Sequence, residues 1–156
     1  MKTFLLVITA IFILSGCTTR NAFEKFDLKN DQTMAVENSR SGKLIEDGKV
    51  VGLYSAVYLN NIYTNVKDTS EAFYISVYKK DGVYSDINMS LNSNDSFRVD
   101  ELDKENQFKY LLSTKNRWGR YYLATFDENE DSATNILEIG IGNSSSGKVF
   151  FLKDRQ

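Results

Sequence analysis

Apolar residues from about position 50 onward come in short runs rich in Val, Ile, Tyr and Phe, separated by clusters of Asn, Asp, Ser and Gly. Runs of this length and composition predict β-strands, and their close spacing is typical of a sandwich or a barrel. The expected strands lie at residues 50–59, 73–79, 83–91, 108–113, 120–126, 136–141 and 148–153. We therefore expect an all-β domain, an immunoglobulin-like or transthyretin-like β-sandwich of about seven strands.

Alternation with a period of two supports several of these strands, because successive side chains of a strand point to opposite faces of its sheet. Apolar residues occupy every second position in two of the runs, and more polar residues or glycines stand between them. The sets expected to face the core are Phe73, Ile75 and Val77 in one strand and Leu137, Ile139 and Ile141 in another.

Residues 17–49 are polar and weakly patterned, and they contain several turn-forming pairs. They predict a tether with one short helix, which Asp31 would cap and which would turn Met34 and Ala35 inward. The expected organisation is a leader at 1–16, a lipidated cysteine and tether at 17–49, and one β-sandwich domain at 50–156.

The first residues have the features of a secretory leader. Lys2 supplies a positive charge, and residues 4–14 form an almost unbroken apolar run. A membrane-spanning helix needs about 20 apolar residues, so this run is too short for a permanent span. It ends in Leu14-Ser15-Gly16-Cys17, which resembles the lipobox that signal peptidase II recognises in bacterial lipoproteins.

The resemblance implies cleavage before Cys17 and attachment of acyl chains, palmitate among them, to that residue. Lipidation would consume a thiol that an oxidising compartment would otherwise leave reactive, whereas the alternative is an ordinary secretory signal followed by a free cysteine. Several chains, at about 0.8 kcal/mol per buried methylene, give stable anchoring. Thr18 stands where an aspartate often marks retention at the inner membrane, so the resemblance implies the outer membrane, facing the periplasm or the cell surface.

The charge and residue composition argue against nucleic-acid binding and against several classes of catalytic site. The formal net charge is −2, from 19 basic and 21 acidic residues, and the chain lacks the basic surplus that nucleic-acid binding needs. It has no histidine and one cysteine, so Ser-His-Asp and Cys-His sites lack a base and a zinc site lacks its usual ligands. We expect no catalytic activity, with a carboxylate-dependent hydrolase as the remaining enzymatic alternative.

An acidic stretch after residue 126 is the one candidate metal site. Asp127, Asn129, Asp131 and Glu138 match positions 1, 3, 5 and 12 of an EF-hand calcium loop in residue type. Ser132 stands where that loop needs glycine, and the flanking runs predict strands where the EF-hand has helices. We favour a solvated acidic hairpin loop and expect no cofactor, with calcium binding as the alternative.

Asn88 is a candidate glycosylation site. It lies in Asp86-Ile87-Asn88-Met89-Ser90, which resembles the extended bacterial sequon with an acidic residue two positions before the asparagine. A chance match among three Asn-x-Ser triplets is the competing explanation.

Tyrosine and tryptophan are favoured at contact surfaces because they bury area and keep a polar group. Tyr74, Tyr78 and Trp118 are the candidate partner surface, whereas core packing explains most of the other tyrosines. The run at 56–61 and the architecture resemble small sandwich lipoproteins that tether envelope or secretion machinery, which implies a protein partner in the envelope. A module for a small ligand, a glycan or calcium is the alternative.

Overall fold

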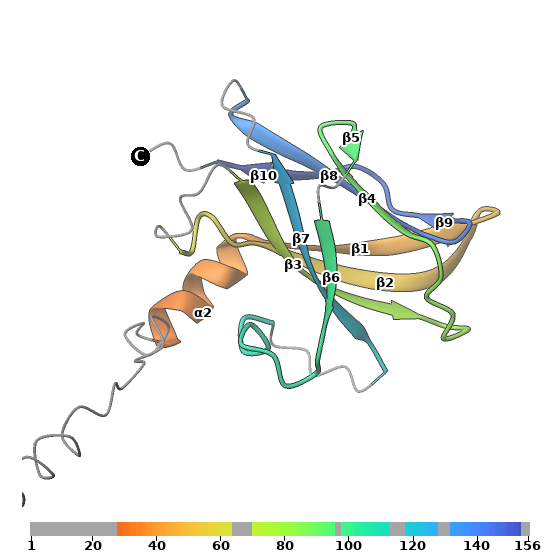
Figure 1. Cartoon of the computed structure of the whole chain (residues 1–156), viewed down its shortest axis with the longest axis horizontal. Helices are drawn as coiled ribbons and strands as arrows, with labels where there is room; N and C mark the ends of the chain where they lie inside the picture. The colour runs from red at the N-terminus through yellow and green to blue at the C-terminus, as the bar shows by residue number, and fades with distance from the viewer. Residues whose placement is uncertain (1–27, 64–69, 96–97, 113–117, 128–131, 154–156) are drawn as a thin grey trace, which may run out of the picture.

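The computed structural model describes residues 28–63, 70–95, 98–112, 118–127 and 132–153 (Figure 1). Within these ranges the chain forms one helix, α2 (Leu28–Glu37), and ten strands. The strands are β1 (Ser39–Glu46), β2 (Lys49–Tyr58), β3 (Ser70–Lys79), β4 (Ile87–Leu91), β5 (Asn94–Asp95), β6 (Arg98–Leu102), β7 (Arg120–Asp127), β8 (Thr134–Ile141), β9 (Ser144–Ser145) and β10 (Val149–Leu152). The expected all-β class is confirmed.

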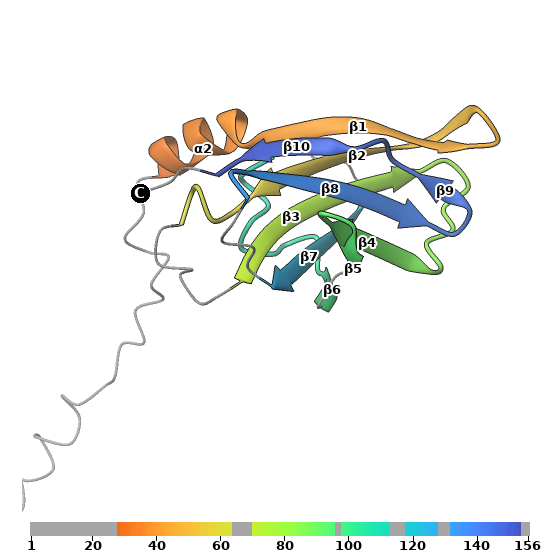
Figure 2. The ribbon, with the colours of Figure 1, turned by 90° about the horizontal axis from the view of Figure 1, so that it is seen from above.

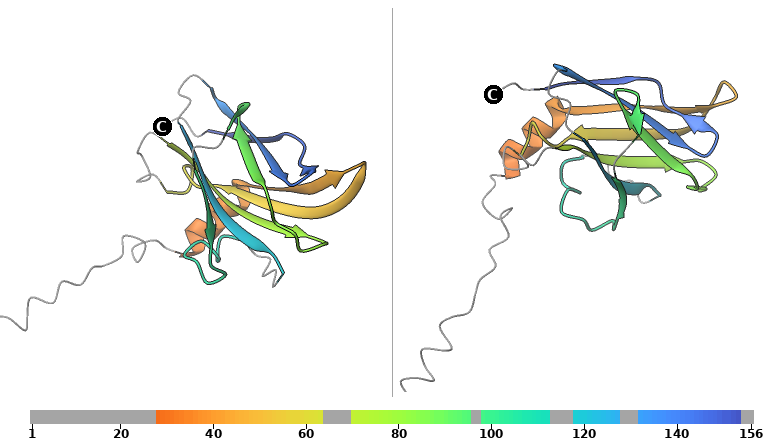
Figure 3. Two further views of the ribbon diagram at one scale, coloured as in Figure 1. Left: turned by 45° about the vertical axis from the view of Figure 1, so that its right-hand side comes forward. Right: turned by 45° about the horizontal axis from the view of Figure 1, so that its top comes forward.

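The strands form one antiparallel sheet in the order β5-β4-β8-β9-β1-β2-β3-β7-β6, and β10 pairs with β8 off this path. A two-sheet sandwich was the expectation, but the short strand β9 pairs with both β8 and β1 and joins the two groups of strands. The sheet curls so strongly that it nearly closes on itself (Figures 2 and 3).

The inner face of the curled sheet holds the main core. One cluster of buried side chains draws on strands from both groups, β2, β3 and β7 on one side and β4, β8 and β10 on the other. Both sets of residues expected to face the core are confirmed there: Phe73, Ile75 and Val77 on β3, and Leu137, Ile139 and Ile141 on β8. Burying each of these side chains contributes about 1.5–3 kcal/mol to folding.

A second buried cluster lies on the outer face of β2, β3 and β7. It includes Val57, Tyr74 and Tyr121 from the strands, together with Ala35 from α2 and Phe108 from residues 103–112. The helix and the 103–112 segment therefore cover one part of the outer face, towards the end of the sheet where β2 stops and β3 starts (Figure 1).

The sheet begins earlier than expected, at Ser39, so most of residues 39–49 is strand and not tether. Leu44 is the one fully buried residue of β1, so the sequence of this strand shows no alternation of apolar and polar residues. Backbone pairing with β2 holds the strand in place. The short helix is confirmed, with Ala35 buried and Met34 packed beside it. Asp31 is not its cap, because α2 starts at Leu28 and the Asp31 side chain is buried.

Residues 108–112 form turns, not the expected strand. Asn106 caps this segment locally, since its side-chain oxygen accepts from the Phe108 amide at 2.9 Å, and the Leu111 amide donates to the Phe108 carbonyl at 2.9 Å. Residue 113 lies outside the described residues. The strand expected at 83–91 starts only at Ile87, after Asp86 has turned the chain with a φ of 51°.

The close approach of β2 and β3 makes Gly52 sensitive to substitution. A Cβ there would lie 2.5 Å from the Tyr78 carbonyl oxygen, a backbone atom that cannot move without disturbing the ladder. We predict that Gly52→Ala lowers the free energy of unfolding by about 2 kcal/mol. Gly147→Ala is the matched control, because a Cβ at Gly147 meets nothing within 4 Å. Equal urea midpoints for the two variants would contradict the prediction.

Candidate functional site

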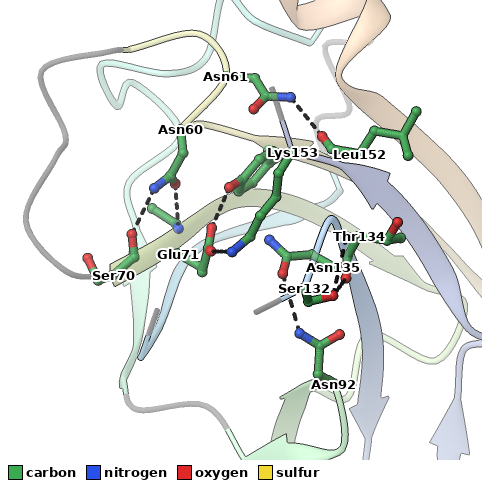
Figure 4. A network of polar contacts seen from close by, with 12 residues as sticks. Asn60, Asn61, Ser70, Glu71, Asn92, Ser132, Thr134, Asn135, Leu152 and Lys153 are labelled. Atoms are coloured by element: carbon green, nitrogen blue, oxygen red, sulfur yellow. Dashed lines mark hydrogen bonds and ion pairs between the residues drawn. The ribbon is translucent and has the colours of Figure 1, made fainter. Parts of the chain in front are cut away.

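A buried carboxylate lies on the inner face of β3, near the end of the sheet where α2 packs (Figure 4). Glu71 is 2% exposed, and it receives a short hydrogen bond from the Tyr58 hydroxyl on Oε2 and a close ion pair from the Lys153 ammonium on Oε1. Each oxygen of the carboxylate therefore has its own partner, which a buried charge requires.

Asn135 lies on the inner face of β8 and is 0% exposed. Its Oδ1 accepts from Asn92 Nδ2 at 3.4 Å, but its own Nδ2 has no hydrogen-bond partner among the described residues. Asn92 is held by the Ile136 amide, which donates to Asn92 Oδ1 at 2.9 Å. We refer to Tyr58, Glu71, Asn135 and Lys153 as the Glu71 cluster.

Two further asparagines fix the chain around the Glu71 cluster. Asn60 donates to the Ser70 carbonyl at 2.7 Å and accepts from the Ala72 amide at 2.8 Å, so it closes the connection between β2 and β3. Asn61 donates to the Leu152 carbonyl at 2.9 Å and thereby ties the end of β10 to the same connection. Side-chain hydrogen bonds thus hold the backbone on both sides of Glu71 and the backbone immediately before Lys153.

A second polar cluster, on the opposite face of the sheet, attaches α2. The hydroxyls of Tyr63 and Tyr110 lie 2.6 Å apart, and the buried Asp31 of α2 is next to them. Burial raises the pKa of the Tyr63 hydroxyl. The pKa of Tyr110 is also raised, by burial and by the Asp31 carboxylate, although the hydrogen bond with Tyr63 lowers it in part. Because the buried carboxylates Asp31 and Glu71 lie on opposite faces, they cannot act together on one bond as a hydrolase pair would require.

Large apolar side chains are exposed in two separate places among the described residues. Val36, Phe150 and Leu152 lie near the end of the sheet where α2 packs. The other group lies at the opposite end, where β2 and β7 start and β3 stops. We call this second group the far-end surface: Val50, Leu53, Val83 and Trp118.

Tyr84 fixes the backbone of Trp118 at the far-end surface. Its hydroxyl donates to the Trp118 carbonyl at 3.1 Å and accepts from the Lys79 amide at 3.0 Å. The Arg120 guanidinium lies 4.8 Å from the centre of the Tyr84 ring and pairs through two 3.0 Å hydrogen bonds with Glu101. The Trp118 side chain is 79% exposed although its backbone is held.

Of the three residues expected on a partner surface, the structure leaves two accessible to solvent. Tyr74 is 0% exposed and stacks on Tyr121, with ring centres 6.0 Å apart, under the outer-face cover that includes Phe108. Placing Tyr74 on an accessible surface was therefore wrong, because the alternation does not show that the chain covers its own outer face. Tyr78 is partly exposed and pairs with Leu53, and Trp118 is exposed as expected.

The other candidate sites are described only in part. Asp127 is exposed at the end of β7, whereas Glu138 lies on β8 opposite Ser90, and Asn129 and Asp131 lie outside the described residues. The described part of the chain holds no group of three or more His, Cys, Asp or Glu able to bind a metal ion. Asn88 is exposed on β4, opposite Gly140, so its glycosylation stays a prediction.

Cys17 also lies outside the described residues. In the ranges that the structure covers, no helix has the length and apolar character needed to cross a membrane. Comparison with known proteins gives no match to a family model, a curated protein or a solved structure.

Burial of the tyrosines predicts a loss of stability in alkali. Burial raises the pKa of Tyr74 and of Tyr122 from 10.0 to about 12. Between those pH values the unfolded chain releases these protons and the folded chain keeps them, so the free energy of unfolding falls as pH rises from 10 towards 12. Tyr74→Phe should make this decline less steep, as measured by urea unfolding at successive pH values. An unchanged slope would show that Tyr74 ionises alike in both states.

Proposed function

We propose that this protein is a non-catalytic lipoprotein of the bacterial outer membrane, anchored through Cys17, whose far-end surface binds a protein partner in the cell envelope. The observation that carries the partner proposal is the exposure of Trp118, 79%, on a backbone that Tyr84 holds in place. A large aromatic ring on a fixed backbone loses little conformational freedom on binding, and tryptophan is enriched at the residues that dominate binding energy.

The position of the far-end surface relative to α2 supports this proposal. α2 begins at Leu28, eleven positions after Cys17, and packs towards the end of the sheet opposite Trp118. A lipid anchor at Cys17 would hold the α2 end of the domain towards the bilayer. The far-end surface would then be presented to another protein of the periplasm or the cell surface.

The chemistry of the far-end surface resembles a small protein interface. Val50, Leu53 and Val83 are each about half exposed, and charged side chains such as Lys49 and Asp81 lie beside them. Exposed apolar and aromatic side chains near charged ones are a composition found in protein–protein contacts.

The anchoring proposal predicts that Cys17→Ser abolishes incorporation of a palmitate analogue and releases the protein from the membrane fraction of its native host. The reason is that the thiol is the only attachment point for the first lipid, because the chain has one cysteine. Metabolic labelling followed by fractionation of the envelope measures both effects. Labelling that persisted in the variant would refute the anchor at this residue.

The partner proposal predicts that a photo-crosslinking amino acid at position 118 of the full lipidated protein, expressed in its native host, gives one covalent adduct. Val83→Asp should reduce that adduct at least tenfold, since Val83 directly precedes Tyr84, whose hydroxyl bonds to the Trp118 carbonyl. A loss of about 1.4 kcal/mol corresponds to tenfold in affinity. Mass spectrometry of the adduct identifies the partner.

Position 150 is the matched control for this experiment. Phe150 is 55% exposed at the other end of the sheet, so a crosslinker there samples an apolar surface of similar exposure. An adduct of equal yield from position 150, or one that is unaffected by Val83→Asp, would count against the far-end surface as the binding site.

A further inference from the structure

The Glu71 cluster contains an amine, a carboxamide and a carboxylate in one buried site, which are the groups needed to form an amide bond between side chains. We propose that Lys153 Nζ and Asn135 Cγ become joined by an isopeptide bond, with Glu71 relaying the protons. This inference concerns a modification of the fold, and it does not depend on the proposed partner.

The strand register places the two reacting residues on the same face. Phe151 pairs directly with Asn135 in the β8–β10 ladder. The Lys153 amide donates to the Ala133 carbonyl at 3.1 Å, so Lys153, immediately after β10, continues the ladder with the inward parity of Phe151. Same-face diagonal neighbours of an antiparallel pair have Cα atoms about 7–8 Å apart, within the reach of a lysine side chain. Figure 4 shows the Lys153 ammonium and the Asn135 carboxamide directed towards the space beside Glu71.

The surroundings exclude water and bring the groups together. Asn135 and Glu71 are 0% and 2% exposed, and the Lys153 side chain is 13% exposed. The rings of Tyr58, Phe73 and Phe151 pack against one another around the site, with centres 5.1 Å and 5.2 Å from that of Phe73. Holding reactants side by side in a dry site replaces a bimolecular encounter with an intramolecular one, which is worth several orders of magnitude in rate.

The reaction balances without any further reagent. Lys153 first passes a proton to the Glu71 carboxylate, and this neutralises two buried charges. The free amine attacks Asn135 Cγ, forming the C–N bond while the carbonyl electron pair moves to Oδ1. Glu71 gives its proton to Asn135 Nδ2 and accepts one from Lys153 Nζ. The bond from Cγ to Nδ2 breaks, ammonia leaves, and Glu71 is left protonated.

One contact of the Asn135 side chain and one missing contact suit its role as the electrophile. Asn92 Nδ2 donates to Asn135 Oδ1, so it polarises the carbonyl and stabilises the negative charge that develops on that oxygen. Asn135 Nδ2, the leaving group, has no hydrogen-bond partner among the described residues. Buried amide nitrogens are normally hydrogen-bonded, so an orphaned one calls for an explanation. Departure as ammonia would remove this unsatisfied donor.

The proposal is tested by mass spectrometry of the folded wild-type protein, measured once intact and once as proteolytic peptides. We expect the intact protein to be lighter, by one molecule of ammonia, than the same processed and lipidated chain without the bond. We expect tandem mass spectrometry to find one branched peptide containing both Asn135 and Lys153. Full mass for natively folded protein would overturn the proposal.

Two variants separate this bond from other losses of ammonia. Lys153→Arg keeps a cation for Glu71 and should fold, but its guanidinium cannot attack, so the expected mass is that of the unmodified variant. A loss of ammonia that persisted in Lys153→Arg would indicate a cyclic imide at an asparagine and would overturn the proposal. Glu71→Gln should retain the hydrogen bond to Tyr58 and still lack the branched peptide.

Lys148→Arg is the matched control. Lys148 is exposed immediately before β10, so its replacement should leave the branched peptide in wild-type yield. Loss of the branched peptide in Lys148→Arg would show that its formation does not depend specifically on Lys153.

Discussion

The carboxylate of Glu71 stands among aromatic rings on the inner face of β3, where an unpaired charge would cost several kcal/mol. Lys153 and Tyr58 neutralise and solvate it, and they come from the segment after β10 and from the end of β2. The ion pair therefore ties a strand at the middle of the sheet to the last described residue of the chain. Because β10 pairs with β8, this contact draws the two groups of strands together at the end remote from β9.

The outer face of β2, β3 and β7 is covered near α2 and exposed towards the opposite end. Towards the α2 end, the helix and the 103–112 segment bury Tyr74 and Val57, and the hydroxyls of Tyr63 and Tyr110 hold this cover together with Asp31. Towards the far end nothing in the described chain covers Leu53. The chain thus covers Tyr74 and Val57 on the outer face near α2 and leaves Leu53 uncovered towards the opposite end.

Alternation along the chain was sufficient to predict the inner face, because Phe73 and Leu137 lie in strands whose apolar positions recur strictly every second residue. It could not predict β1, in which every residue except Leu44 and Ile45 is polar or glycine. It also could not show that Tyr74 is covered, since that depends on residues 103–112 packing from elsewhere in the sequence. The Glu71 cluster did leave a signal: Glu71, Asn135 and Lys153 each continue the inward parity of a predicted strand with a polar residue.

That polar continuation is the feature that simple packing does not account for. Well-packed apolar residues in place of a buried ion pair are often neutral or stabilising, so stability alone gives little reason for Glu71 and Lys153 to lie inside an aromatic core. An orphaned carboxamide donor on Asn135 adds a further penalty of about 1–3 kcal/mol. A covalent bond between the amine and the carboxamide would remove the orphaned donor and both charges of the ion pair, since the reaction leaves Glu71 protonated. It would also fasten the terminal strand to its neighbour, which hydrogen bonding across the four residue pairs of β8 and β10 does only weakly.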